Sequence, residues 1–503
     1  MSDKKASYKE TLKNTTIFGG VQIINVLISV IRGKFISVLL GPVGMGITSL
    51  LNSPLMLIGT ITGMGLRLSA VREISEAYKT DDQIKIARVV TIARKLFFLL
   101  GILGSGVTLA MAPLLSHLSF GNQEYTWAFV WLSITIFLAT MSEGQNTLLR
   151  SFRKISHIVK SGLIGSVLGL ITSIPLYYFY GVKGIVPAMI LSALILCILT
   201  WYYERKIVVE DVKISFKEMY IEGFDMVKMG LMLVIAIFLG HLCQFGINIS
   251  IGYFGNISDV GFYAAATAIS AQYIGFILIS LSVDYFPRLA AVNKDILKTN
   301  KVVNEQMEIV LLLAAPLLIL MILTSSILIR VLLTPEFLVI TDFIRYVAIG
   351  SFFQAASFSI GYISFAKNDK YVYLLLEGGF SNLLKFVFSV TFYYYWGLKG
   401  LGFSFLAIYF TYFIVINVFT YKRYKFRLTK NTIKLFLITL ILLVTSLLVV
   451  TLSTKTYGYI FGGVILVGSA YYSYLELDKL MDLKEIILRL FSKIVKKNRN
   501  KGE

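Results

Sequence analysis

Apolar segments long enough to cross a lipid bilayer follow one another along almost the whole 503-residue chain, and 56% of its residues are hydrophobic. A helix of about 20 apolar residues spans the hydrocarbon of a membrane. Because a bilayer offers no water to irregular backbone, segments of this kind are expected to be helical. We therefore predict an all-α polytopic membrane protein with about fourteen transmembrane helices. The predicted spans lie at roughly residues 15–39, 44–67, 91–115, 126–149, 157–179, 184–203, 229–253, 260–286, 307–333, 340–365, 371–395, 399–420, 432–452 and 456–474.

Lys and Arg gather in every second connection between these segments. The chain has 48 of them against 28 Asp and Glu, which gives a formal net charge of +20. The connections after odd-numbered spans hold only Lys183, Lys399 and Lys455. Since positively charged loops stay in the cytoplasm, we predict a multi-pass protein with both termini cytoplasmic. This distribution accounts for the positive charge without nucleic acid, which we exclude as a partner.

One short motif occurs twice. The run YYFYGVKGIV (residues 177–186) returns as YYYWGLKGLG (residues 393–402), and Val43-Gly44 pairs with Val260-Gly261 at almost the same offset. Because each repeat would hold an even number of spans, the halves share one orientation, as in an alternating-access carrier. We predict two six-helix lobes related by a pseudo-two-fold axis along the membrane normal. The predicted domains are the N-lobe at 1–225, the C-lobe at 226–425, an extra helix pair at 426–475 and a basic amphipathic cytoplasmic tail at 476–503.

The sequence lacks the signatures of common catalytic centres. It has no Gly-x-x-x-x-Gly-Lys-Ser/Thr loop for nucleotide phosphates. Its two cysteines, Cys197 and Cys243, lie inside apolar runs, and its three histidines are scattered. These residues cannot build a disulfide framework or a metal cluster. We predict that the protein is not an enzyme and needs no cofactor and no metal.

Ionisable side chains inside the predicted spans are the candidates for function, because burying them in a membrane is expensive. Lys385 is the clearest, near the middle of its span, and Glu377 precedes it by two turns. An internal Lys–Glu pair that only fixes packing is the alternative for these two. Cations outnumber carboxylates, which suits an anionic substrate, and Arg forms forked hydrogen bonds to phosphate. The candidate substrate-binding residues are Lys385, Arg32, Lys34, Arg67, Arg345, Gln22 and Asn25.

Three carboxylates are candidates for coupling transport to an ion: Asp284, Glu143 and Glu377. Asp284 and Glu143 lie in the inner thirds of their spans, where neutralising nearby cations is the alternative role. For some of the cations, a position that has nothing to do with substrate binding also remains open. Lys34 and Arg345 can extend their charges to the membrane surface, and Arg67 lies near an inner end, where positive charge is expected.

Three further pieces carry a family resemblance: LLGPVGMGITSLLNSPLMLIGTITGMG (residues 39–65), ISLSVDYFPRL (279–289) and IGYISFAKNDKYVYLLLEGGF (360–380). Through about its first 420 residues, the chain resembles the Wzx-type O-antigen flippases. These form the polysaccharide-transport branch of the multidrug/oligosaccharidyl-lipid/polysaccharide exporter superfamily. Lys367, Glu377 and Pro287 match the residue types of the family pattern. The last two predicted spans depart from its twelve-span pattern and leave open a closer relation to longer polysaccharide exporters or to lipid II flippases.

The resemblance implies two six-helix lobes in a V shape and a function in O-antigen and lipopolysaccharide biosynthesis. The substrate would be a short oligosaccharide on undecaprenyl pyrophosphate, moved from the inner to the outer leaflet of the bacterial cytoplasmic membrane. Membrane lipids, a polysaccharide polymerase and chain-length proteins would be its partners.

Two other functions remain open. A cation-coupled multidrug exporter of the same superfamily would need an acidic site in the N-lobe, where the first span offers only Gln22, Asn25 and Arg32. A scaffold or a glycan-polymerase subunit is the third reading, and no large outer loop of the kind found in polymerases occurs between the predicted spans. The energy source, the sugars of the substrate and the oligomeric state cannot be read from these residues.

Overall fold

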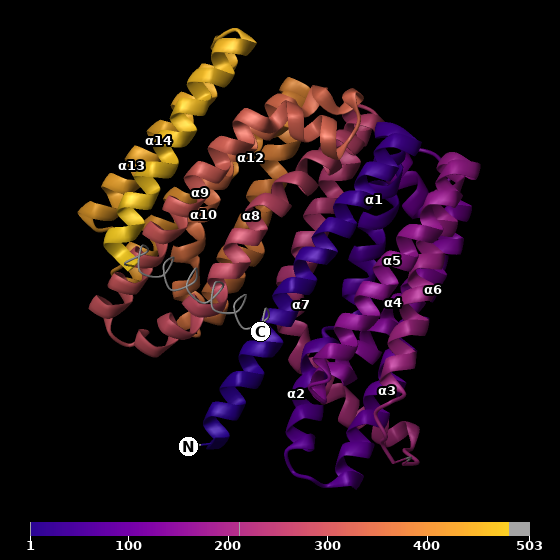
Figure 1. Cartoon of the computed structure of the whole chain (residues 1–503). Coiled ribbons are helices and arrows are strands. Elements are labelled where there is room, and N and C mark those ends of the chain that lie inside the picture. The colour runs from indigo at the N-terminus through magenta and orange to yellow at the C-terminus, as the bar shows by residue number, and fades with distance from the viewer. Residues whose placement is uncertain (1, 211, 482–503) are drawn as a thin grey trace, which may run out of the picture. The chain divides into compact units, whose positions relative to one another are not determined.

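The structure is a computed structural model that describes residues 2–210 and 212–481, and the described chain is built of helices (Figure 1). Side chains are not described at residues 2–23, 25, 216–217, 220–221, 225, 228–233, 272–274, 276–277, 279–284, 370, 455 and 481. The helices are α1 (Ser2–Gly63), α2 (Leu66–Tyr78), α3 (Gln83–Phe120), α4 (Thr126–Ser151), α5 (Ile155–Tyr180), η1 (Gly181–Gly184), α6 (Ile185–Glu204), α7 (Phe216–Phe254), α8 (Ile257–Val292), α9 (Ile296–Leu332), η2 (Pro335–Ile340), α10 (Thr341–Ala366), α11 (Lys370–Tyr373), η3 (Leu374–Phe380), α12 (Ser381–Tyr424), α13 (Lys430–Leu452) and α14 (Lys455–Met481).

Every predicted span falls on one or more of these helices. Within the described residues, nine helical stretches are long and apolar enough to cross a membrane, and three of them each contain two predicted spans. The all-helical prediction is therefore confirmed, while the number of crossings stays a prediction. The part of the predicted tail from residue 482 on lies outside the described residues.

The chain divides into two compact units, which we describe separately. Unit 1 takes the residues up to Ala265 together with Val331–Phe337, and unit 2 takes Ala266–Arg330 and the residues from Leu338 on. The predicted domain boundaries, at residues 225, 425 and 475, stay predictions.

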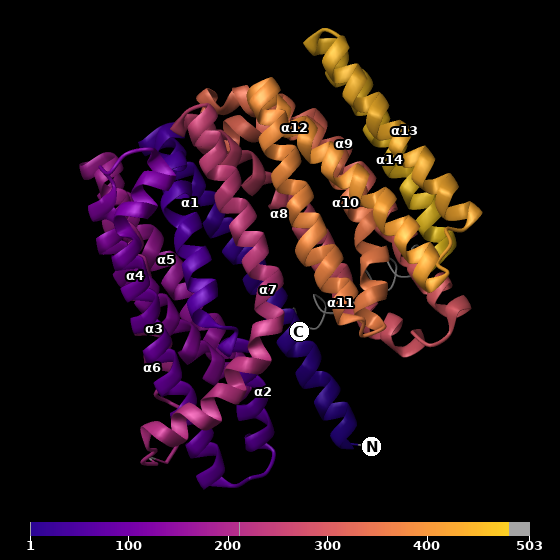
Figure 2. The ribbon, with the colours of Figure 1, turned by 180° about the vertical axis from the view of Figure 1, so that it is seen from behind.

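Unit 1 is a bundle in which α3, α4, α5 and α6 run side by side (Figures 1 and 2). Its core has one apolar cluster contributed by α1, α3, α4, α5 and α6 and another contributed mainly by α2, α3, α4 and the first turns of α7. Local chemistry sets the helix ends. The Asp82 side chain caps α3 by accepting hydrogen bonds from the amides of Ile84 and Lys85 at 3.0 and 3.1 Å.

Ion pairs join the end of α6 and the start of α7 to α3. Arg88 pairs with Glu222 at 2.6 Å and with Glu218 at 3.2 Å, and Arg94 pairs with the buried Glu204. The Ser215 amide donates to Glu218, and this hydrogen bond, helped by the Arg88 guanidinium, lowers the pKa of the Glu218 carboxyl. The carboxylates on either side of the α6–α7 connection therefore hold its ends against the bundle.

The twice-occurring motif forms the same turn in both places. Gly181 (φ 55°, ψ −132°) and Gly397 (φ 59°, ψ −142°) share a left-handed backbone that favours glycine. Three residues later, a Cβ on Gly184 or Gly400 would lie 2.2 or 2.0 Å from a carbonyl oxygen of the preceding helix. In each copy the first tyrosine is buried and the three aromatic residues after it are exposed. Exposed Tyr and Trp suit a membrane interface.

Two backbones meet in unit 1 at the second pair of matching segments. Helix α1 bends at Gly41 (φ 65°), and the following turn packs on the start of α8. A Cβ on Gly46 would lie 1.9 Å from the carbonyl oxygen of Ile257, and a Cβ on Gly261 would lie 1.9 Å from that of Pro42. The contact therefore requires glycine on both sides.

Replacing Gly46 by Ala is expected to destabilise the protein by about 1–3 kcal/mol, because the new methyl group overpacks a backbone contact. Thermal unfolding of the detergent-purified protein measures this effect. Gly59→Ala, on the same helix with no atom within 4 Å of the added Cβ, is the matched control. Equal melting temperatures for both variants would contradict the close contact.

In unit 2, the helices α13 and α14 run side by side (Figures 1 and 2), and polar groups join α13 to α9. The Thr432 hydroxyl donates to the buried carboxylate of Glu308 at 2.6 Å. The Asn304 side chain accepts from the amide of Thr429 at 2.9 Å and donates to the carbonyl of Arg427 at 3.0 Å. Hydrogen bonds inside an apolar region are costly to leave unmade. These hydrogen bonds therefore fix the position of α13 against α9.

Thr432→Val should lower the free energy of unfolding by about 1–3 kcal/mol, because it removes a donor from a buried carboxylate. Thr432→Ser keeps the hydroxyl and should retain most of the stability. Thr451→Val, at an exposed position of the same helix, should change little. Chemical denaturation of the three variants in detergent tests the contact, and a Thr432→Val protein as stable as Thr432→Ser would refute it.

Candidate functional site

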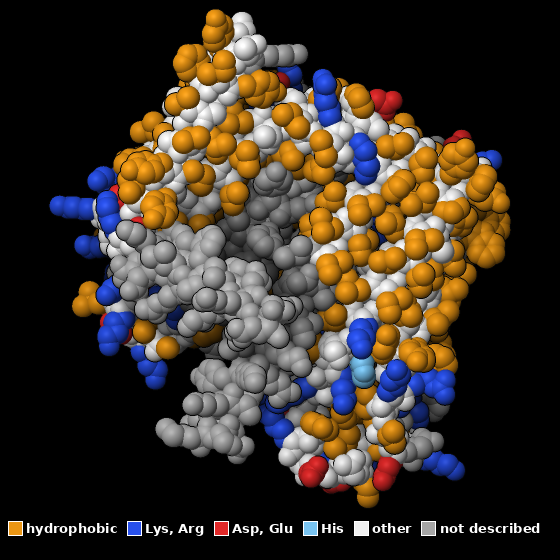
Figure 3. Space-filling view, viewed as in Figure 1, with side chains coloured by type: hydrophobic (Ala, Val, Ile, Leu, Met, Phe, Trp, Pro, Cys, Tyr) orange, Lys and Arg blue, Asp and Glu red, His pale blue; other side chains and the backbone are white. Residues whose placement is uncertain are grey.

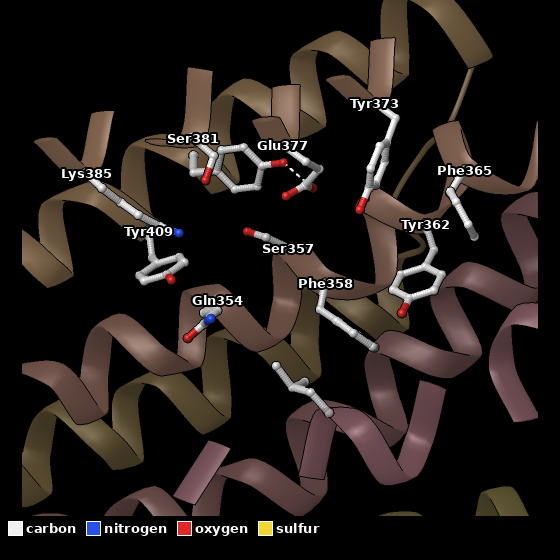
Figure 4. Close-up of a pocket in the computed structure, with 13 residues that line it drawn as sticks. Gln354, Ser357, Phe358, Tyr362, Phe365, Tyr373, Glu377, Ser381, Lys385 and Tyr409 are labelled. Atoms are coloured by element: carbon white, nitrogen blue, oxygen red, sulfur yellow. Dashed lines mark hydrogen bonds between the residues drawn. The ribbon is translucent and has the colours of Figure 1, made fainter. Parts of the chain in front are cut away.

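Unit 2 contains a cavity of about 300 Å³ that combines charged, polar and aromatic side chains (Figure 4). This volume is at the lower end of the range for ligand sites. The cavity lies among α8, α10, α11, η3 and the two parts of α12 before and after its bend at Gly397. Its lining residues are Leu278, Gln354, Ser357, Phe358, Gly361, Tyr362, Phe365, Tyr373, Glu377, Ser381, Lys385, Tyr409 and Tyr412.

A π-helical turn, η3, brings Glu377 to the cavity. Such turns hold an extra residue and often occur at functional sites. Here the turn contains Gly378 and Gly379, and the Asn382 side chain donates to the carbonyls of Glu377 and Gly378 at 3.4 and 2.8 Å. The side-chain amide thus satisfies backbone oxygens in the widened turn. The turn fixes the direction in which Glu377 points.

The Glu377 carboxylate has a specific partner and little free space. The hydroxyl of the buried Tyr412 donates a hydrogen bond to its Oε1, drawn as a dashed line in Figure 4. On the opposite wall, a Cβ on Gly361 would come within 2.8 Å of the same oxygen. Glycine at this position of α10 therefore makes room for the carboxylate.

Lys385 lines the same cavity from α12, one element further along the chain. Its Nζ lies 6.0 Å from the ring centroid of Tyr409, at the limit of a cation–π contact. Among the described residues, no carboxylate lies within 4.0 Å of this ammonium group. Lys385 and Glu377 therefore share a cavity without the direct contact of the internal ion pair that the sequence left open.

The rest of the cavity divides into a polar and an aromatic part. Figure 4 shows Gln354 and Ser357 on the side of Lys385, and Phe358, Tyr362 and Tyr373 on the other side of Glu377. Polar groups fix a ligand's orientation, while rings supply contact area. This arrangement can hold a polar ligand that carries negative charge.

The N-terminal candidates Arg32 and Lys34 lie in unit 1, and different partners hold them. Arg32 donates to the hydroxyls of Ser192 on α6 at 2.9 Å and Ser173 on α5 at 3.4 Å. Lys34 donates to the carbonyl of Leu333. No carboxylate of the described residues lies within 4.0 Å of the Arg32 guanidinium, so its charge is met only by neutral hydroxyl groups.

The other charged candidates already have ionic partners. Glu143 lies 3.5 Å from Arg67 and 3.9 Å from Arg150. Arg345 contacts Asp342 at 3.1 Å and the Ser325 hydroxyl at 3.2 Å. Neither group lines the cavity. The side chains of Gln22, Asn25 and Asp284 lie outside the described residues.

Several cavity residues were absent from the sequence-based candidates. Tyr412 follows Glu377 by 35 positions, and Gln354 and Ser357 come from another helix. The one usable signal was the Gly378-Gly379 pair beside a carboxylate inside an apolar span, which marks backbone that departs from a regular helix.

Comparison with known proteins places this fold in a family. Residues 38–342, more than half of the chain, match the model of a family described as "Polysaccharide biosynthesis protein". The chain belongs to this family. The matched region ends before η3 and α12, so Glu377 and Lys385 lie beyond it.

Individual relatives are distant but cover most of the chain. The lipid III flippase of Escherichia coli (strain K12) is 21% identical over 390 residues, which are 76% of this chain and 91% of that protein. The lipid III flippase of Shigella flexneri matches to the same extent.

Two solved membrane transporters share the fold. The lipid II flippase MurJ, in an inward closed conformation, aligns with a TM-score of 0.68 at 13% identity and covers 93% of this chain and 99% of that one. An inward-facing multidrug resistance MATE family transporter of the MOP superfamily aligns with a TM-score of 0.67 at 16% identity and covers 80% of this chain and 94% of that one. At these identities the likeness shows that this chain shares the all-helical fold of these proteins.

Proposed function

We propose that the protein is a flippase for lipid-linked oligosaccharides. It would move a short oligosaccharide on undecaprenyl pyrophosphate, an O-antigen or related repeat unit, from the inner to the outer leaflet of the bacterial cytoplasmic membrane by alternating access. The observation that supports this most is the unit 2 cavity, where the Lys385 ammonium group and the Glu377 carboxylate meet aromatic rings between helices of an apolar bundle. Membership of a polysaccharide biosynthesis family and the likeness to two lipid III flippases support the same reading.

Each charged group of the cavity has a proposed role. Lys385 would attract the negative charge of the diphosphate or of an acidic sugar, because its ammonium group lines the cavity and has no carboxylate of the described residues within 4.0 Å. Glu377 would exchange the coupling proton, with Tyr412 orienting its carboxyl group. Arg32, half-buried and hydrogen-bonded to the hydroxyls of Ser173 and Ser192, is a further proposed anion contact in unit 1.

A second function, cation-coupled multidrug export, is favoured by one specific feature. Glu377 lies among aromatic rings, a combination that suits an organic cation, and MATE transporters share the fold. The two functions make different predictions for the same cells. A flippase restores surface polysaccharide to a bacterial strain that lacks its own flippase, whereas a drug exporter raises resistance to ethidium and similar cations.

Complementation of flippase-deficient strains, each making a different lipid-linked oligosaccharide, is therefore the test. We expect restored surface polysaccharide in at least one strain and no change in ethidium resistance. Ethidium resistance with no restored polysaccharide in any strain would favour the drug exporter. Lys385→Ala and Lys399→Ala, tested side by side, separate the cavity charge from a lysine of the exposed turn.

A further inference from the structure

A second cluster of charges lies in unit 1 and includes none of the residues assigned to transport. Lys and Arg side chains gather around a histidine near the lower ends of α4 to α6 in Figure 3. The helix ends there supply five exposed cations and two exposed rings. This basic-aromatic surface comprises Arg153, Lys154, Lys160, Trp201, Tyr202, Arg205 and Lys206.

Aromatic rings hold these cations at the surface. The guanidinium of Arg205 lies 4.6 Å from the ring centroid of Trp201, and the ammonium of Lys206 lies 4.5 Å from that of Tyr202. Lys154, Lys160 and Lys206 are all close enough to act electrostatically on His157. Positive charges from the start of α5 and the end of α6 are therefore concentrated in one small area.

Several arginines of unit 1 have carboxylate partners, whereas the cations of this surface have none within 4.0 Å among the described residues. Arg72, Arg88 and Arg94 each pair with a glutamate. In contrast, none of the five cations of the basic-aromatic surface lies within 4.0 Å of a carboxylate in the described part of the chain. The adjoining Glu204 is buried and pairs with Arg94. The surface thus presents positive charge that an external anion can neutralise.

The helices above this surface present apolar faces that continue from it. On α5, Ile164 and Val167 are exposed one and two turns beyond Lys160, on the same side of the helix. On α6, Ile198 and Leu194 are exposed one and two turns before Trp201. A ligand that fits both parts has an anionic head and long apolar chains. In the predicted orientation this end faces the cytoplasm, where the membrane surface carries anionic lipids.

We propose that the basic-aromatic surface binds an anionic phospholipid of the bilayer, with its phosphate at the cations and its acyl chains along α5 and α6. This site is separate from the unit 2 cavity and does not depend on the proposed transport function. Its ligand is a component of the surrounding membrane rather than a transported molecule.

Quenching of Trp201 fluorescence by brominated lipids tests this proposal on the full-length protein. The chain has four tryptophans, so the substitutions Trp127→Phe, Trp131→Phe and Trp396→Phe leave Trp201 as the sole reporter. The protein is placed in vesicles of phosphatidylcholine with increasing brominated phosphatidylglycerol, or with brominated phosphatidylcholine as the neutral probe. We expect phosphatidylglycerol to bind at least about tenfold more strongly, since each nearby Lys or Arg favours anionic lipid.

Matched variants decide whether the effect is local. Lys154→Gln, Lys160→Gln and Lys206→Gln, combined, should reduce the preference for phosphatidylglycerol to within about twofold. The same change at Lys294, Lys298 and Lys301, exposed lysines of unit 2, should leave it intact.

Three results would overturn the proposal. Equal quenching by both lipids would exclude a preference, and equal losses in both triple variants would exclude a local site. Displacement of phosphatidylglycerol by inorganic pyrophosphate would identify a site for small anions instead. Thermal unfolding of each variant, expected to be unchanged, ensures that a loss reflects binding.

Discussion

Glu377→Gln is expected to reduce transport of the lipid-linked oligosaccharide about 100-fold, the largest effect of any single substitution in the cavity. Glutamine has nearly the same shape as glutamate and can still accept the hydrogen bond from Tyr412. It cannot take up or release a proton. The variant therefore separates titration from packing, and its folding should be close to that of the unmodified protein.

The dependence on a proton gradient gives the sharper readout for this variant. In proteoliposomes, the unmodified protein should transport faster when a proton gradient is imposed, and Glu377→Gln should not respond to it. Tyr412→Phe, which removes the hydroxyl that donates to the carboxylate, should slow transport about tenfold and keep the response. Glu305→Gln, at a glutamate on α9 that pairs with surface cations, is the control. If transport by Glu377→Gln still responds to the proton gradient, this carboxylate does not couple transport to protons.

Lys385→Ala is expected to reduce transport roughly 30- to 100-fold, because it removes an ammonium group that lines the cavity and has no carboxylate of the described residues within 4.0 Å. The defect should appear mainly as weaker substrate binding, since the positive charge attracts an anionic head group. Lys385→Arg keeps the charge and should retain a substantial part of the activity.

Controls for Lys385 come from the same helix and from the substrate. Lys399→Ala, at an exposed position of α12, should transport normally. An analogue with one phosphate in place of two should lose less on Lys385→Ala than the diphosphate does. If Lys385→Ala binds and transports the diphosphate normally, the anion contact must be sought elsewhere, first at Arg32.

The helical fold could be predicted from the sequence because lipid allows few alternatives. Apolar segments of membrane-spanning length must be helices, and the twice-occurring Gly-x-Lys-Gly turn could be recognised from its letters alone. Gly181 and Gly397 have the same left-handed backbone conformation, and this gives the physical reason why the motif is repeated. The close contact at Gly46 was less accessible, since a glycine inside a helix does not say which backbone approaches it.

The site was only partly predictable. Glu377 and Lys385 were both identified as costly charges within one span, and both line the cavity. The relative position of the Glu377 and Lys385 side chains could not be derived from helical spacing, because the π-helical turn changes the direction in which Glu377 points. Tyr412 comes from a distant part of α12, which no local pattern connects to Glu377. Arg32 and Lys34 are only two positions apart, yet they contact different elements because helical residues at this spacing point in different directions.

The most direct test of the central claim is leaflet-specific transport by the purified protein. Proteoliposomes are loaded with undecaprenyl pyrophosphate that carries a fluorescent oligosaccharide, and a membrane-impermeant quencher reports how much of it faces outward over time. The proposed function predicts that the protein accelerates exchange between leaflets and that Lys385→Ala and Glu377→Gln largely abolish the acceleration. Exchange no faster than in protein-free liposomes, by a folded protein supplied with oligosaccharides from several bacterial sources and with a proton gradient, would contradict it.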